Sequence, residues 1–181
     1  MVEEAVSLSQ ELLSSLGRRW RHVQGVASKA AELAWVLDED QRETLLAAAW
    51  LHDIGYAPEL ALTGFHPLDG ARYLRYQAWP AQVVNLVAHH SGARFEAAER
   101  GLVHGLSEFD HEDSPIMDAL VTADLTTGPT GEHIAYDERI AEILDRYPPE
   151  DPVHRTWVEA APILKECVLR TEKRLTEIQP R

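Results

Sequence analysis

The chain has 181 residues, of which 45% are hydrophobic, and 30 acidic against 17 basic residues give it a formal net charge of -13. This length accommodates one domain with a substantial core and is short for two. The negative balance should repel nucleic-acid phosphates, and no apolar run approaches the roughly 20 residues that cross a bilayer, so neither a nucleic-acid polymer nor a membrane is expected as a partner.

The first residues and the single cysteine indicate the compartment. The opening stretch MVEEAVSLSQELL is acidic where a signal peptide would be basic, which argues against secretion. Cys167 is the one cysteine and cannot form an internal disulfide, and its apolar neighbours predict an inert, buried thiol. Both features predict a cytoplasmic protein, and a homodimer stays an open alternative for its assembly.

Apolar residues recur at helical spacing along nearly the whole chain, while strand signals are almost absent, so the predicted fold is all-α. Glycine, proline and acidic clusters mark the turns. In chain order, the predicted helices span residues 3–16, 18–37, 40–53, 67–78, 80–90, 93–99, 114–126, 135–146 and 152–177. Asp40 is expected as an N-cap with Glu43 as its capping partner, and Pro67 and Pro115 fall where a first-turn proline is tolerated.

Several polar side chains lie on faces that their helices should bury. A lone histidine there is usually a hydrogen-bonded core residue, and a lone aspartate at a helix end is usually a cap. Several such residues on separate helices are hard to explain as independent accidents. A shared metal site explains them better, because buried carboxylates without a counter-charge are costly and a metal would supply that charge. The set comprises His22, His52, Asp53, His66, His89, His90 and Asp124.

The donor types narrow the choice of metal. Imidazoles with two carboxylates suit iron, manganese, zinc, cobalt or nickel better than magnesium or calcium. The donors are too many for one tetrahedral ion, so two divalent ions bridged by a carboxylate are expected. The other histidines, which lie in polar segments and are expected at the surface, are His104, His111, His133 and His154.

The order of these residues resembles a known signature. His22, then the pair His52-Asp53, then Asp124 is similar to the H…HD…D pattern of the HD-domain metal-dependent phosphohydrolases, which are all-α bundles. The resemblance runs from about Arg19 to Asp124. It implies one HD domain over residues 1–181, with a metal-site core at about 19–126 and the C-terminal helices of 135–177 packing on it.

The extra histidines resemble those of the binuclear subgroup. They lie in the segments FHPLDGARYL and LVAHHSGAR. The resemblance implies that one metal is held by His22, His52, Asp53 and Asp124. Asp53 would bridge to a second metal completed by His66 and His89, with His90 as a further ligand or a supporting group. Iron is the expected metal, and Gly55 is expected to keep the turn after Asp53 from crowding it.

The implied chemistry is phosphate-ester hydrolysis. A hydroxide bridging two divalent ions would attack phosphorus in line, with Asp53 as the bridging ligand and with Arg19 and Arg94 as candidate phosphate clamps. For Arg94, a solvated surface position is an equal alternative. The loop at 126–131 is expected either to line the entrance or to serve only as a turn.

Two departures limit the resemblance. Tyr56 stands where many such phosphohydrolases have a lysine that can touch phosphate, and HHSGARFEA lacks the GYP element of cyclic-dinucleotide phosphodiesterases. A cyclic dinucleotide is therefore not expected. The favoured function is hydrolysis of a nucleotide or another small phosphate ester. Two alternatives stay open: a mixed-valent di-iron oxygenase that cleaves a C–C or C–P bond, and a non-catalytic nucleotide-binding regulatory module.

Overall fold

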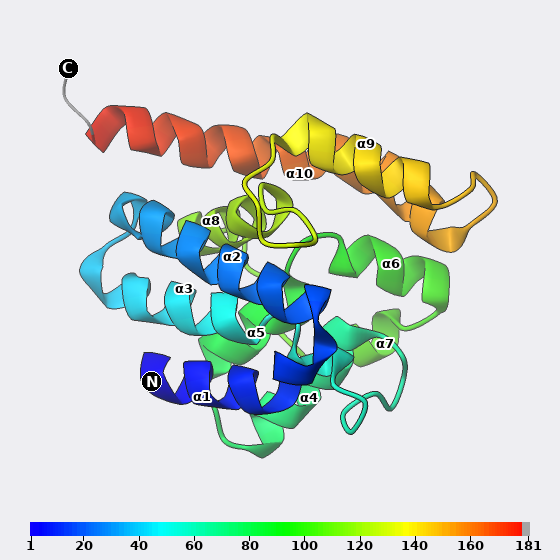
Figure 1. The fold of residues 1–181 in the computed structure, drawn as a ribbon, viewed down its shortest axis with the longest axis horizontal. Helices are drawn as coiled ribbons and strands as arrows, with labels where there is room; N and C mark the ends of the chain where they lie inside the picture. The colour runs from blue at the N-terminus through cyan, green and yellow to red at the C-terminus, as the bar shows by residue number, and fades with distance from the viewer. Residues whose placement is uncertain (179–181) are drawn as a thin grey trace.

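The computed structural model describes residues 1–178, and Figure 1 shows an arrangement of helices joined by loops. In chain order the elements are α1 (Val2–Leu13), η1 (Ser14–Leu16), α2 (Arg18–Leu33), η2 (Ala34–Val36), α3 (Glu39–Leu51), η3 (Ile54–Tyr56), α4 (His66–Tyr76), α5 (Ala81–His89), α6 (Ala93–Arg100), α7 (Val103–Leu106), α8 (Pro115–Leu125), α9 (Tyr136–Arg146) and α10 (Pro152–Ile178). The described residues contain no strand, only an isolated bridge between Thr127 and His133. The all-α prediction is confirmed.

The predicted helix positions agree closely with the structure, with two corrections. The N-cap of α3 is Asp38 rather than Asp40, because Asp38 is the last residue with extended backbone and the helix begins at Glu39. The stretch after Gly101, expected as a loop, contains the short helix α7, whose single turn has no periodic pattern to detect. Pro67 and Pro115 do lie in the first turns of α4 and α8.

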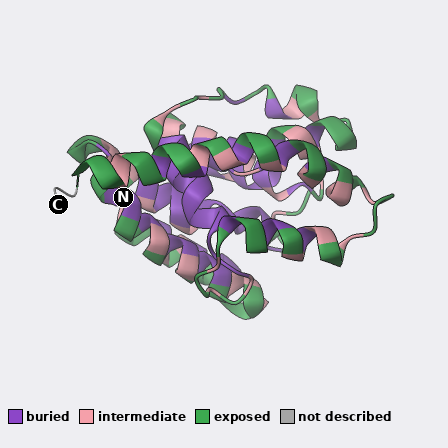
Figure 2. Ribbon diagram, turned by 90° about the horizontal axis from the view of Figure 1, so that it is seen from above, coloured by how far each residue is buried: buried purple, intermediate pink, exposed green. Residues whose placement is uncertain are grey.

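Two apolar clusters meet at α3. One joins α3 to α2, α8 and α10 through residues such as Leu45 and Leu120, and the other joins it to α1, α4 and α5 through residues such as Leu51 and Leu68. Figure 2 shows the buried residues on the inner sides of the helices and the exposed residues on the outer sides. The C-terminal end of α3, where His52 and Asp53 follow, is therefore anchored from both sides.

The long helix α10 packs along α8, α9 and α6. Leu164 and Val168 bury its inner face, and Tyr136 of α9 donates a hydrogen bond from its hydroxyl to the Ala161 carbonyl at 2.6 Å. Among the described residues, no helix combines the length and apolar character that crossing a membrane requires.

Candidate metal centre

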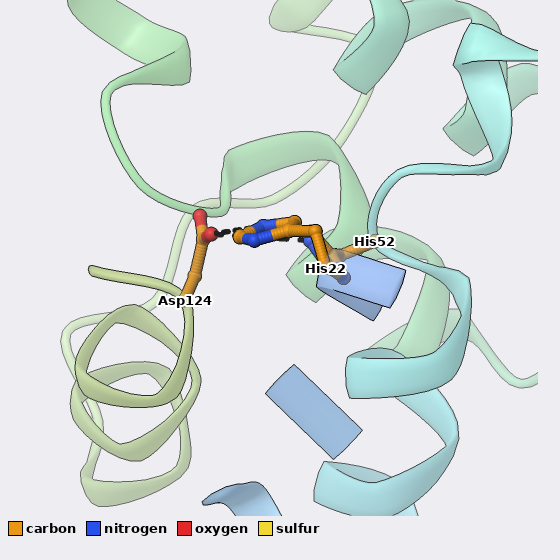
Figure 3. Close-up of side chains that lie close together, drawn as sticks. All are labelled: His22, His52 and Asp124. Atoms are coloured by element: carbon orange, nitrogen blue, oxygen red, sulfur yellow. Dashed lines mark hydrogen bonds and ion pairs between the residues drawn. The ribbon is translucent and has the colours of Figure 1, made fainter. Parts of the chain in front are cut away.

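Six side chains from different elements converge in two groups. The first contains His22 of α2, His52 at the end of α3 and Asp124 of α8, and Figure 3 shows these side chains lying close together. The second contains Asp53, His66 at the start of α4 and His90 after α5. Within each group, one ligand atom of every residue lies within 4.8 Å of the others, and all six residues except the half-buried His66 are buried.

Backbone carbonyls orient three of the four imidazoles. The Nδ1 atoms of His22, His52 and His90 lie 3.0, 2.8 and 2.7 Å from the carbonyl oxygens of Gly128, Ala49 and Val87, respectively. A carbonyl only accepts, so this network assigns the proton of each neutral ring to Nδ1. Each Nε2 then presents a lone pair toward the carboxylates, which is the arrangement expected of metal-ligating histidines.

Asp53 lies between the two groups. Its Oδ2 is 3.3 Å from His52 Nε2 and 3.9 Å from His22 Nε2, while its Oδ1 is 3.2 Å from His66 Nε2 and 3.9 Å from His90 Nε2. One oxygen thus faces each group. This is the placement that a bridging carboxylate needs.

The donor set fits transition-metal ions. The Nε2 of His52 is buried without a hydrogen-bond partner among the described residues. The Nε2 atoms of His66 and His90 face each other at 3.2 Å, where two lone pairs would repel unless a proton or a cation lay between them. Imidazole nitrogens mixed with carboxylate oxygens suit iron, manganese, zinc, cobalt or nickel.

Local charges keep the carboxylates ionised. Burial alone would raise the pKa of Asp53, but Arg19 and His52 hold it well below its usual range. Burial likewise opposes the charge of His52, yet the neighbouring carboxylates of Asp53 and Asp124 raise its pKa to about 9. Burial, followed by the charges of His52 and His66, lowers the pKa of His90 to about 3. Metal ligation requires such ionised carboxylates, and it would displace any proton on His52 Nε2.

The turn after Asp53 depends on Gly55, for a different reason from the expected one. A Cβ on Gly55 would lie 2.0 Å from the backbone oxygen of His66 and 2.8 Å from the Gly70 nitrogen. The glycine therefore permits a close backbone crossing with α4 that brings His66 beside Asp53. Asp69, which the sequence did not single out, accepts hydrogen bonds from the backbone nitrogens of Thr63 and Gly64 and closes the loop that leads into α4.

His90, rather than His89, joins the second group. His89 Nε2 lies 2.9 Å from the Phe109 carbonyl oxygen, and the ring packs edge-on against His111. His90 follows the last residue of α5 with extended backbone, which directs its ring toward His66, whereas the Nε2 of His89 is occupied by the Phe109 carbonyl. Of the two candidate ligands His89 and His90, the geometry therefore favours His90.

The two candidate clamps have different surroundings. Arg19 forms an ion pair with Asp53, and its guanidinium lies 3.9 Å from the Tyr56 ring centroid. Tyr56 in turn stacks on His66 with ring centroids 4.0 Å apart. Arg94 is exposed over the Phe95 ring and does not line the cavity at the metal centre, which favours its surface alternative.

The other predicted features are placed as follows. His104, His111 and His133 are exposed and His154 is half-buried. The loop at 126–131 backs the centre through the Gly128 carbonyl, and its residues 126–128 are buried. Cys167 is half-buried rather than fully buried, and burial followed by the charge of Asp118 raises the pKa of its thiol to about 11, which disfavours a reactive thiolate.

A cavity of about 300 Å³ opens at the centre and includes residues that sequence reasoning missed. Ser91 donates a hydrogen bond from its hydroxyl to Asp124 Oδ2. Arg139 and Arg146 of α9 and Trp157 of α10 also line this cavity. The sequence does carry a sign that Arg139 is buried, because its helical spacing places it on the same face of α9 as the buried residues Tyr136 and Ile143.

The comparisons with known proteins agree with this geometry. The family model described as HD domain matches residues 19–150, a range that contains all six converging residues. No curated protein and no solved structure matches the chain significantly. HD domains are in general metal-dependent phosphohydrolases. With its family model matched over most of its length and its signature residues gathered in one place, the chain belongs to the HD domain family.

Proposed function

We propose that the chain is a binuclear metal-dependent phosphohydrolase acting on a nucleotide or another small phosphate ester. One observation carries the proposal: imidazole nitrogens of four histidines converge with carboxylate oxygens of two aspartates, and one oxygen of Asp53 faces each group. The chain's membership of the HD domain family supports the reaction class.

The first metal would be held by His22, His52, Asp53 and Asp124, and the second by Asp53, His66 and His90. When bound, two such ions supply a nucleophile at neutral pH and positive charge for the phosphate oxygens. The chain's own residues do the positioning. Ser91 orients Asp124 through its hydrogen bond, and Gly128 orients His22 through its carbonyl.

Arg19 is the candidate phosphate ligand at the centre. Its guanidinium lies between the Asp53 carboxylate and the Tyr56 ring, and it lines the cavity. A guanidinium can bind two phosphate oxygens at once, which orients a phosphoryl group for in-line attack. Tyr56 is a positioning residue, because its ring contacts both Arg19 and His66.

A di-iron oxygenase remains the second candidate. The same six donors would serve it, and Tyr56 occupies the place where a phosphate-binding lysine would favour hydrolysis. Iron-dependent oxygen uptake, without phosphate release from esters, would support this candidate over the first. Metal binding with neither activity would support the regulatory alternative.

The direct test is hydrolysis of bis-p-nitrophenyl phosphate and a nucleotide panel by metal-loaded protein. We expect turnover that a chelator abolishes, and a loss of about a hundredfold or more in Asp53→Ala and His66→Ala, since each removes a metal ligand. His104→Ala, an exposed histidine on α7, is the matched control and should keep its activity. Turnover that survives Asp53→Ala would contradict the assignment.

A further inference from the structure

Four arginines from two distant parts of the chain line a pocket beside the metal centre. The pocket has a volume of about 250 Å³, and its cations are Arg18 and Arg19 of α2 with Arg139 and Arg146 of α9. No carboxylate of residues 1–178 lines it. In a chain with a net charge of -13, such a local concentration of guanidinium groups favours an anionic occupant. We call it the arginine pocket.

One of these guanidinium groups has an unused, buried donor. Arg139 is only 9% exposed, and its Nε has no hydrogen-bond partner among the described residues. A buried donor without an acceptor is destabilising by about 1–3 kcal/mol. Because an arginine offers only donors, the missing partner must be an acceptor, as an anionic oxygen is.

The carboxylates near the pocket do not neutralise it. Glu142 binds both Arg139, at 2.5 Å, and Arg146, so one negative charge serves two positive ones. Arg19 is paired with Asp53, a residue of the metal centre. Arg18, at the first position of α2, adds a further positive charge. The balance leaves the pocket cationic.

The pocket adjoins the cavity of the metal centre and shares lining residues with it. Arg19, Arg139 and Arg146 line both, and so does His22, a proposed metal ligand. A ligand with one phosphate at the centre can therefore extend another anionic group toward the arginines. The forked guanidinium donors match the oxygens of a phosphate group.

We propose that the arginine pocket, with the buried Nε of Arg139 unpaired, binds a second phosphate of the substrate, so that the substrate carries at least two linked phosphates rather than one. The identity of the occupant as a substrate rests on the phosphohydrolase function proposed above. The anion site itself rests on the arginines and does not depend on turnover.

The test is isothermal titration of the metal-loaded full chain with pyrophosphate and with orthophosphate. We expect wild-type protein to bind pyrophosphate about tenfold more tightly, because only the longer anion spans the centre and the pocket. Arg18→Ala should weaken pyrophosphate binding by about three- to tenfold and leave orthophosphate within about twofold. The Arg18 variant separates the two anion sites, because Arg18 lines the arginine pocket but not the cavity of the metal centre.

Arg21→Ala is the matched control. It removes the same charge from the same helix, at an exposed position that lines neither cavity, and should leave both affinities within about twofold. Metal content measured after each titration accounts for chelation by pyrophosphate. All three proteins keep the proposed metal ligands, so chelation affects them equally.

Equal affinity of wild-type protein for the two anions, or equal behaviour of Arg18→Ala and Arg21→Ala, would overturn the second-phosphate site. The hydrolase assignment is tested separately, by the turnover assay. Preference for pyrophosphate without ester hydrolysis overturns the hydrolase and the occupant's identity as a substrate, but not the anion site. Hydrolysis without that preference overturns only the second-phosphate site.

Discussion

His89 and His90 are adjacent in the sequence and have different partners in the structure. His90 leaves the end of α5 with its Nδ1 hydrogen-bonded to Val87 and its Nε2 facing His66, while His89 bonds to the Phe109 carbonyl. His90 is therefore a proposed ligand, and His89 supports the fold.

This difference predicts a difference in metal affinity. His90→Ala should weaken binding of one metal by about tenfold or more, because it removes a ligand, whereas His89→Ala should lose only a neutral hydrogen bond worth about 1 kcal/mol of stability. Competition with a chromophoric chelator would measure the affinity, and thermal unfolding the stability. Equal loss of metal affinity in the two variants would refute the choice of His90.

The candidate ligands were predictable because polar residues interrupt apolar stripes. The choice between His89 and His90 was not predictable, since it depends on the dihedral angles at which α5 ends. Arg139 escaped notice because an arginine in an acidic, amphipathic helix is typical of a solvated face. Arg139 is 9% exposed in the fold, where α9 packs against α8 and α10.

At the scale of elements, Asp118 links α8 to α10. Its side chain is 3% exposed and accepts hydrogen bonds from Arg170 Nε at 2.9 Å and Arg174 Nη1 at 2.7 Å. Burial would raise the pKa of Asp118, but the hydrogen bonds of Arg170 and Arg174 hold it below its usual value. The ionised carboxylate therefore helps to hold the C-terminal helix on the rest of the fold.

Asp118→Asn should lower the free energy of unfolding at pH 7 by about 1–3 kcal/mol, a range that allows for the solvent exposure of the arginines. The pKa of Asp118 is lower in the folded state than the roughly 3.9 expected when unfolded, so its contribution is complete above about pH 5 and is lost as the pH falls through the folded-state pKa. Urea unfolding at pH 7 and near pH 3 should show that the difference in free energy of unfolding between the variant and the wild type is smaller at the lower pH.

Asp137→Asn provides the control for that series. Asp137 of α9 also pairs with a residue of α10, Lys165, but the Asp137 side chain is 75% exposed. The substitution should therefore change the free energy of unfolding by no more than about 0.5 kcal/mol. If Asp118→Asn were as mild as Asp137→Asn at pH 7, the role of Asp118 in anchoring α10 would be wrong.

Helix positions were predictable at this scale because the 3.6-residue period is a local property of the sequence. The crossing of Gly55 over the start of α4 was not predictable, because it is a contact between segments that are separate in the sequence. The contact depends on the course of the chain through residues 57–65, which join η3 to α4.

At the scale of the whole molecule, net charge and local charge disagree. The chain is strongly acidic, yet four arginines from α2 and α9 gather beside the centre. The overall charge is the basis for the prediction that nucleic-acid polymers are not partners, which stays a prediction, while the local charge favours a small anion. The net charge can be calculated from the composition, whereas the local concentration of arginines is visible only in the folded structure.

The position of the centre follows from the two apolar clusters. Helix α3 belongs to both, and the proposed ligands lie on elements that pack around its C-terminal end. A site supported on rigid helices holds its ligands more accurately than one built on loops.

Metal stoichiometry tests the central claim most directly. Protein purified anaerobically and analysed by inductively coupled plasma mass spectrometry should contain about two transition-metal ions per chain, one for each group of converging ligands. Protein that contains no metal and acquires none when supplied with iron, manganese, zinc, cobalt or nickel would contradict the account, and a ratio that saturates near one would contradict the second site.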